Sequence, residues 1–244
     1  MSDKPVMIEI EDLRKSFGDV HAVAGLDLRV ASGELFCFLG PNGAGKTTTI
    51  KMMSGLLKPS SGRIMIKGMD LRENAQAVKK ITGYIPDQPY LYERLTAAEF
   101  YEFTGDLYGI PRDEIRAKRE KAFDLFGLVD YEDSLVKNMS HGIRQRLTYA
   151  SVFLHDPEVM FIDEPFIGLD PYSIRLIKTL LREKCNAGAT IFLTTHILAL
   201  AEDMADRIGI IDNGKLVALG TLHELLRKTE VQGRLEDVFL KLTE

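Results

Sequence analysis

Cysteine is scarce in this chain of 244 residues, which contains only Cys37 and Cys185. Two cysteines cannot form the disulfide framework of a small secreted protein, so we expect a reducing cytoplasm and no disulfide. No apolar run approaches the roughly 20 residues of a membrane-spanning helix, and the opening MSDKPVMIEI lacks the apolar segment of a signal peptide. The sequence predicts a chain that does not cross a membrane by itself.

Basic residues are not in excess either. The chain carries 31 Lys and Arg against 36 Asp and Glu, which gives a formal net charge of −5. This balance argues against non-specific nucleic-acid binding, so no nucleic-acid partner is expected and a bound phosphate must be held by local groups. Apolar residues make up 45% of the sequence, enough for a sizeable core, and the length favours one domain with room for a subdomain.

The apolar residues follow two patterns along most of the chain. Alternation with polar residues predicts half-buried strands in MIEIEDL and GLDLRV. Solid apolar runs predict central strands buried on both faces in ELFCFLG, EVMFIDE and ATIFLTT. Shorter strands are expected in GRIMIKG, in TGYI and in the hairpin IGIIDNGKLVAL, whose Asn213-Gly214 pair is typical of a two-residue turn. Parallel strands joined by helices, together with hairpins, predict a mixed sheet.

Strand patterns disappear between about residues 96 and 156. Thr96 and Glu99 have the spacing of a capping box and predict the start of one helix. A second helix is expected at 111–126, before Gly127, and a third at 140–154, where apolar residues recur at helical spacing. A helical segment therefore interrupts the α/β core.

The segment GPNGAGKTT has the pattern of a phosphate-binding loop (P-loop), between an expected strand and an expected helix. Glycines let backbone N–H groups surround phosphate, Lys46 can reach the β- and γ-phosphates, and Thr47 can ligate Mg²⁺. The predicted ATP-binding residues are Gly40, Pro41, Asn42, Gly43, Ala44, Gly45, Lys46, Thr47 and Thr48. The fold class expected is α/β, with a P-loop NTPase core, a mixed sheet, an inserted α-helical subdomain and N-terminal antiparallel strands.

Asp163 and Glu164 end the expected strand EVMFIDE. Because the carboxyl ends of parallel strands meet at one edge of a sheet, we expect this pair near the P-loop. Asp163 could then hold Mg²⁺ through water, and Glu164 could orient the attacking water. Taken alone, an acidic pair before Pro165 is more often a helix cap, but its combination with the P-loop favours the site.

His196 follows the expected strand ATIFLTT. A single histidine in this position usually starts a helix or is a satisfied core group. Because its strand ends beside the other two, His196 is also a candidate sensor of the γ-phosphate.

The order of these motifs resembles the nucleotide-binding subunit of an ABC transporter over nearly the whole chain. It runs from the P-loop through MSHGIRQRL, FIDEP and GLDP to TTH. The resemblance implies an ATPase in which two copies enclose two Mg-ATP and drive a substrate through a separate membrane subunit. It implies an ATP-binding core at 1–86 and 157–220, a helical signature subdomain at 87–156 and an amphipathic helical tail at 221–244.

In that family the segment MSHGIRQRL faces the P-loop of a second copy, so Ser140, His141 and Gly142 would act on the partner's nucleotide. The family's usual Leu-Ser-Gly-Gly-Gln is replaced at three places by Met139, His141 and Ile143. Methionine conserves the volume of leucine, His141 is compatible with a right-handed helix, and Ile143 lacks the polar group of glutamine. His141 either gives ATP binding a pH dependence between about pH 6 and 7 or points into solvent.

The glutamine loop is a second departure from the family. Related proteins place a glutamine directly after the strand TGYI, whereas here Asp87 takes that position and Gln88 follows. We favour Gln88 for the glutamine's role, with Asp87 as the alternative. The apolar residues that come next could receive a coupling helix of the membrane subunit or pack locally. They are Tyr90, Leu91, Tyr92 and Leu95.

The resemblance implies the remaining roles. Glu164 and His196 would be catalytic, Phe17 would stack on adenine, and Asp170 of GLDP would link the two sites across the dimer. Thr47 and Asp163 would hold Mg²⁺, the second cofactor beside ATP. The expected partners are a second copy or a homologous ATPase subunit and a multi-span membrane protein, at the cytoplasmic side of the cell membrane.

The end of the chain narrows the subgroup. In RLEDVFLKLTE, apolar residues at helical spacing predict a docked amphipathic helix; they are Leu235, Val238, Phe239 and Leu242. Such an ending resembles the ATPases of exporters whose membrane subunits are separate chains. The alternative is a soluble ABC-type ATPase of a non-transport complex. Those that act on ribosomes usually carry two such domains, those that act on DNA carry a long coiled coil, and a P-loop kinase would lack the signature helix.

Overall fold

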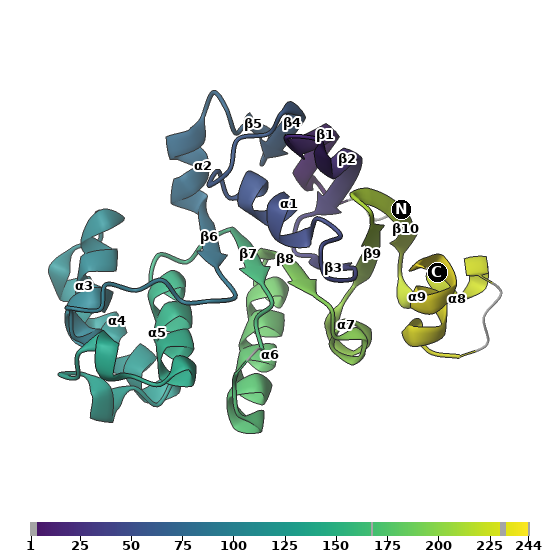
Figure 1. The fold of residues 1–244 in the computed structure, drawn as a ribbon. Helices are drawn as coiled ribbons and strands as arrows, with labels where there is room; N and C mark the ends of the chain where they lie inside the picture. The colour runs from purple at the N-terminus through teal and green to yellow at the C-terminus, as the bar shows by residue number, and fades with distance from the viewer. Residues whose placement is uncertain (1–3, 167, 230–232, 244) are drawn as a thin grey trace.

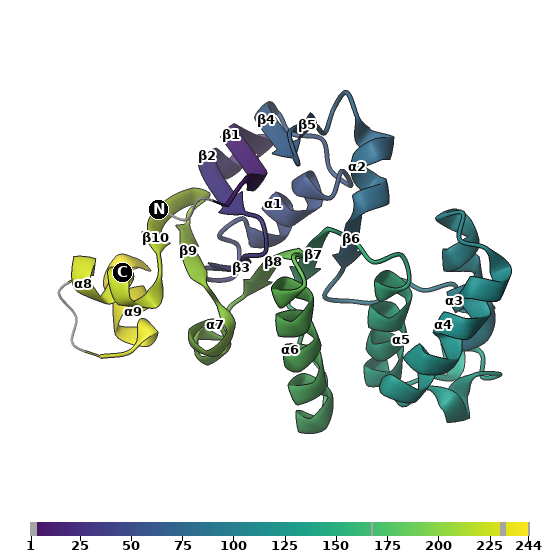
Figure 2. The same ribbon diagram turned by 180° about the vertical axis from the view of Figure 1, so that it is seen from behind.

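The computed structural model describes residues 4–166, 168–229 and 233–243, which form two sheets with helices around them (Figures 1 and 2). The larger sheet has the strand order β10-β9-β3-β8-β7-β6. Its strands are β3 (Leu35–Leu39), β6 (Thr82–Ile85), β7 (Val159–Asp163), β8 (Thr190–Thr195), β9 (Arg207–Asp212) and β10 (Lys215–Gly220). All neighbours are parallel except β9 and β10, so the predicted mixed sheet is confirmed.

The smaller sheet is antiparallel, with the order β2-β1-β4-β5. It consists of β1 (Val6–Phe17), β2 (Val20–Ala31), β4 (Ser61–Ile66) and the short β5 (Met69–Asp70). The alternating patterns at the N-terminus therefore form antiparallel strands, as predicted. Between this sheet and the larger one lies α1 (Lys46–Met53), directly after the P-loop (Figure 1).

The core has two layers, one on each face of the larger sheet. Leu35, Cys37 and Leu39 face a layer that includes α6 (Pro171–Asn186) and α7 (Leu198–Met204), while Phe36 and Phe38 face α1 and the antiparallel sheet. Alternate residues of β3 point to opposite faces because the side chains of a strand have a period of two. The run LFCFL is apolar throughout because both faces of β3 are covered.

Helices fill most of the segment between β6 and β7. They are α3 (Ala97–Leu107), α4 (Arg112–Leu125) and α5 (His141–Phe153), and α2 (Ala75–Ile81) precedes β6. The capping box that begins α3 is complete, since Thr96 Oγ1 accepts from Glu99 N–H and the Glu99 carboxylate accepts from Thr96 N–H. Close contact of α5 with β6 needs Gly83, because a Cβ there would lie 2.5 Å from Val152 Cγ1. This packing fixes α5 to the sheet edge.

The end of the described chain forms a hairpin and two helices. The β9–β10 turn has positive φ values at Asn213 and Gly214, 46° and 75°, as the predicted two-residue turn requires. Helices α8 (Leu222–Thr229) and α9 (Leu235–Thr243) follow. Leu235 and Val238 of α9 are fully buried, so the predicted docked helix is confirmed. Among the described residues, no helix has the length and apolar character needed to cross a membrane.

Candidate functional site

The P-loop connects β3 to α1. Gly45 has a φ of 108°, and a Cβ there would lie 2.4 Å from the carbonyl oxygen of Ala22, so this position requires glycine. As the N-cap residue, Gly45 also has no side chain with which to cap α1. The first backbone N–H groups of the helix are therefore left for an anion, which the helix dipole favours.

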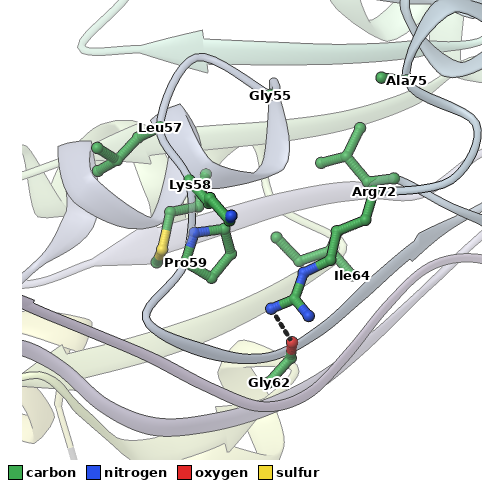
Figure 3. Close-up of a pocket in the computed structure, with 10 residues that line it drawn as sticks. Gly55, Leu57, Lys58, Pro59, Gly62, Ile64, Arg72 and Ala75 are labelled. Carbon is green, nitrogen blue, oxygen red and sulfur yellow. Dashed lines mark hydrogen bonds between the residues drawn. The ribbon is translucent and has the colours of Figure 1, made fainter.

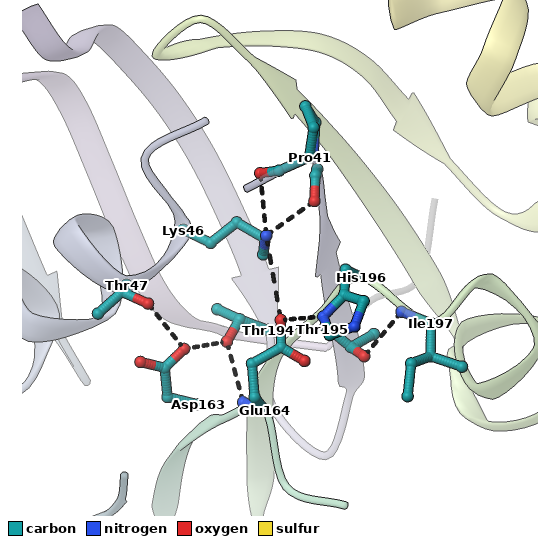
Figure 4. A network of polar contacts seen from close by, with 10 residues as sticks. Pro41, Lys46, Thr47, Asp163, Glu164, Thr194, Thr195, His196 and Ile197 are labelled. Carbon is teal, nitrogen blue, oxygen red and sulfur yellow. Dashed lines mark hydrogen bonds and ion pairs between the residues drawn. The ribbon is translucent and has the colours of Figure 1, made fainter. Parts of the chain in front are cut away.

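Lys46 lies at the mouth of this loop and is almost fully buried (Figure 4). Its ammonium group donates to the carbonyl oxygens of Gly40 (2.7 Å) and Pro41 (3.1 Å), and it lies 4.0 Å from Glu164 Oε1. Burial lowers the pKa of Lys46, while the carboxylates of Glu164 and Asp163 oppose that change. The loop carbonyls hold the charge in place and could be exchanged for phosphate oxygens.

Asp163, at the end of β7, is fully buried. Its Oδ1 accepts hydrogen bonds from the hydroxyls of Thr47 (3.2 Å) and Thr194, whereas Oδ2 has no hydrogen-bond partner within the described part of the chain. Burial raises the pKa of Asp163, and the two hydroxyl hydrogen bonds oppose that rise. A buried carboxylate oxygen without a partner, beside a threonine hydroxyl, matches the hard oxygen ligands that Mg²⁺ prefers.

Glu164 and His196 face the same space from neighbouring strands (Figure 4). Glu164 has a φ of 47°, a left-handed conformation that is uncommon outside glycine and that occurs at functional sites. Its Oε1 lies 2.9 Å from His196 Nδ1. The helix-cap interpretation of the acidic pair is wrong, because α6 begins at Pro171 and is capped by Asp170. His196 is 47% exposed, so it is not a core histidine.

These groups surround a cavity of about 350 Å³. It is lined by Asn42, Gly43, Gly45, Lys46, Thr47, Thr48, Asp87, Glu164 and His196. Strands β3, β7 and β8 and the segment after β6 all contribute, because their carboxyl ends meet at one edge of the sheet. The cavity is at the small end of ligand sites, which suits a triphosphate better than a complete nucleotide.

The structure places Asp87, rather than the favoured Gln88, in this cavity. Gln88 instead lines a neighbouring groove of about 540 Å³, together with residues 89–93 and Arg144. Asp87 Oδ1 accepts a hydrogen bond from the backbone N–H of Gln88 (2.7 Å), and the two neighbouring residues line different spaces. Tyr90 and Tyr92 in this groove are exposed, although the Tyr92 ring also packs edge-on against Phe103, at 5.2 Å.

The signature segment lies apart from the phosphate cavity of its own chain. Ser140 is exposed and caps α5, with Oγ accepting a 3.4 Å hydrogen bond from Ile143 N–H. Met139 and Ile143 are buried in the core, so the polar group that Ile143 lacks would have been buried there. His141 is exposed, yet its ring packs against Gly168, where a Cβ would lie 2.6 Å from His141 Cδ2. Gly142 is half-buried at the start of the helix.

Two other predicted residues lie outside the cavity. Phe17 is 51% exposed at the end of β1, opposite Val20, and the Lys15 ammonium lies 5.0 Å from its ring centroid. The start of β2 contacts the P-loop at Gly45, so Phe17 lies near the loop. Asp170 accepts hydrogen bonds from the backbone N–H and hydroxyl of Ser173, at 2.9 and 2.6 Å, which lower its pKa.

A separate cavity of about 340 Å³ lies near the C-terminal end of α1 (Figure 3). Its lining comes from the end of α1, the loop that follows it, β4 and residues 71–75 up to the start of α2, and it is mainly apolar apart from Lys58 and Arg72. Arg72 donates to the carbonyl oxygen of Gly62 at 3.1 Å. None of the described lining residues belongs to the P-loop, so this cavity is not part of the phosphate site.

Comparison with known proteins identifies relatives of this fold and site. A family described as "ABC transporter" matches residues 23–167. Daunorubicin resistance ATP-binding protein DrrA3 of Streptomyces coeruleorubidus is 38% identical over 96% of this chain and 73% of its own length. Linearmycin resistance ATP-binding protein LnrL of Bacillus subtilis (strain 168) is 36% identical over 97% of this chain and 75% of its own. A solved ATP-binding subunit of an ABC transporter has a TM-score of 0.92 and 34% identity, covering 98% of this chain and 100% of that one.

Proposed function

This chain belongs to the family of ABC transporter ATP-binding subunits, and we propose that its ATPase cycle closes two copies around two Mg-ATP to drive a substrate through a separate membrane subunit. ATP binding and hydrolysis are the activities of this family. The observation that carries the proposal is the convergence of Lys46, Asp163, Glu164 and His196 on one cavity at the sheet edge. A phosphate-sized space with one cation and an acidic pair suits phosphoryl transfer to water.

We infer that each side chain of the cavity has a distinct task. Lys46 would exchange the carbonyls of its loop for phosphate oxygens, joined by the backbone N–H groups of residues 40–48. Thr47 and Asp163 would hold Mg²⁺, which when bound neutralises charge on the β- and γ-phosphates. Glu164 would orient the attacking water and accept its proton, and His196 would steady both Glu164 and the γ-phosphate. Catalysis by such a site is positioning together with electrostatic stabilisation.

A second copy, or a homologous subunit, would complete the site. Ser140 and Gly142, with His141 between them, lie at the exposed start of α5, and we propose that they bind the γ-phosphate held by the partner's P-loop. The N-terminus of α5 favours an anion there. Phe17 would stack on adenine outside the phosphate cavity. Asp170 would link the two sites, with its cap of α6 fixing the loop that contacts the partner.

We further propose peripheral attachment at the cytoplasmic face of the membrane, through a multi-span partner. The groove lined by residues 88–93, with its exposed tyrosines, would receive that partner. Residues 87–156 would form a helical subdomain beside an ATP-binding core made of 1–86 and 157–220. The resistance functions in the names of both relatives support export as the direction of transport. The substrate would be selected by the membrane partner.

Purification of the tagged chain from its native membranes in mild detergent tests this proposal. A co-purifying multi-span protein is expected, and its own sequence would open the question of the substrate. A Lys46→Ala chain, which lacks the only lysine or arginine among the described residues that line the phosphate cavity, shows whether recovery of the partner depends on nucleotide binding. Recovery of the tagged chain with a soluble complex, and without a membrane protein, would refute the transport role but not the ATPase activity.

A further inference from the structure

Asp87 leaves the sheet beside Asp163. Strands β6 and β7 are parallel neighbours in which Ile85 pairs with Ile162, so the residues after each pair emerge side by side. Asp87 is two positions beyond Ile85 and Asp163 is one beyond Ile162. The negative charge of Asp87 also contributes to the raised pKa of Asp163, as expected for two carboxylates near one another. The two carboxyl groups therefore leave the sheet at the same edge, close to the phosphate cavity.

No residue in the described part of the chain forms an ion pair with Asp87. Its one hydrogen bond within the described residues is the local one from Gln88 N–H. Among the described residues that line the phosphate cavity, Lys46 is the only lysine or arginine, and Glu164 is a second carboxylate there. Asp163 adds a third negative group just behind the lining. The cavity thus holds more carboxylates than permanent cations before a nucleotide enters.

This excess of carboxylates affects whether the cavity binds a nucleotide with or without a divalent cation. A triphosphate without metal brings its full negative charge next to Asp87, whereas a divalent cation cancels two of those charges and offers a ligand position to oxygen. A glutamine amide at the same place would neither repel the bare triphosphate nor add charge to the metal shell. An aspartate does both.

We propose that Asp87 makes this site discriminate against metal-free nucleotide, so that ATP enters as its complex with a divalent cation. This inference rests on the proposed function, because it concerns the same phosphate cavity. Asp87 is a specificity residue in this account, while Asp163 and Thr47 hold the cation. The groove occupied by Gln88 has no part in the discrimination, which gives the chain its own control position.

The test is calorimetric binding of the β,γ-imido analogue of ATP to the full chain, once with excess Mg²⁺ and once with a chelator. The quantity compared is the ratio of the two dissociation constants. In Asp87→Asn, which keeps the shape and removes the charge, the metal-free form should bind about tenfold more tightly, and the preference for the Mg²⁺ form should shrink by a similar factor. The double exchange Asp87→Gln with Gln88→Asp keeps the net charge and should behave in the same way. Gln88→Ala should retain the ratio of the unmodified chain.

Three results separate the possibilities. A ratio in Asp87→Asn equal to that of the unmodified chain overturns the inference, and so does an equal effect of Gln88→Ala. If the unmodified chain binds neither form, the proposed function fails instead. Thermal unfolding of each variant serves as the folding control, and little change is expected because Asp87 is half-buried and its hydrogen bond is local.

Discussion

Replacing Thr194 by valine would remove a fully buried hydroxyl while keeping the shape of the side chain. That hydroxyl donates a hydrogen bond to Asp163 Oδ1. It also accepts a 3.4 Å hydrogen bond from Glu164 N–H. Without it, the one hydrogen bond left to Asp163 Oδ1 from a described residue is the longer one from Thr47, at 3.2 Å. Because a hydrogen bond to a charged group contributes about 1.5–3 kcal/mol, we expect the free energy of unfolding to fall by about 2 kcal/mol at neutral pH. For a chain of this size, that corresponds to a melting temperature lower by roughly 4–8 °C.

The loss of stability caused by Thr194→Val should depend on pH. Burial raises the pKa of Asp163 in the native state above its ordinary value of 3.8. Between those two pKa values the unfolded chain has lost the proton that the native chain keeps, so the contribution of Asp163 to stability falls as the pH rises. The Thr194 hydroxyl opposes this rise in pKa by favouring the carboxylate. The loss in the free energy of unfolding caused by Thr194→Val should therefore be largest at neutral pH. It should become smaller in acid, as Asp163 becomes protonated in the native state.

The assay is urea unfolding of Thr194→Val at neutral pH and in mildly acidic buffer, with the same substitution in an Asp163→Asn chain as the control. In the Asp163→Asn background no carboxylate remains at this position, so the loss from Thr194→Val should drop to about 1 kcal/mol or less. An equal loss in both backgrounds, or an equal loss at both pH values, would refute the assignment of Thr194 as the support of an ionised Asp163.

Two further substitutions test the packing of the signature helix and the tail. Ile143→Gln, which restores the family's commoner residue, should lower the free energy of unfolding by about 1–3 kcal/mol, because the amide would enter an apolar core. Ile143→Leu, measured in the same urea titration, should lower it by less than about 1.5 kcal/mol. Val238→Ala should cost about 2 kcal/mol, since Val238 is fully buried, while Leu240→Ala, at a position 50% exposed on the same helix, should change stability by less than about 0.5 kcal/mol. Equal costs for the two tail variants would contradict the docking of α9.

Much of the fold follows from the sequence because its patterns report burial directly. The run LFCFL is solid because both faces of β3 are covered, and the spacing of Thr96 and Glu99 fixes the start of α3 locally. The convergence of the P-loop with Asp163 and Glu164 could be predicted as well, because parallel strands end at a common edge.

Features that depend on tertiary contacts could not be predicted in this way. Asp87 lines the phosphate cavity and Gln88 lines the neighbouring groove. Because both residues are polar, apolar periodicity cannot predict which of them faces the cavity. The inward position of Ile143 depends on the packing of α5 against its neighbours. The support that Thr194 gives to Asp163 could not be predicted either, because the strand TIFLTT contains three threonines and the sequence does not tell which of them faces Asp163.

The central claim, that ATP closes two copies around sites completed by Ser140, is tested most directly by the mass of Glu164→Gln in solution. This variant keeps the binding groups and loses the carboxylate assigned to activating water, so a dimer should accumulate in saturating Mg-ATP and dissociate when ATP is removed. Adding Ser140→Ala should weaken or abolish the dimer, and adding Lys46→Ala should prevent it by removing the phosphate contact. Light scattering that shows only monomer for Glu164→Gln in saturating Mg-ATP would contradict the account.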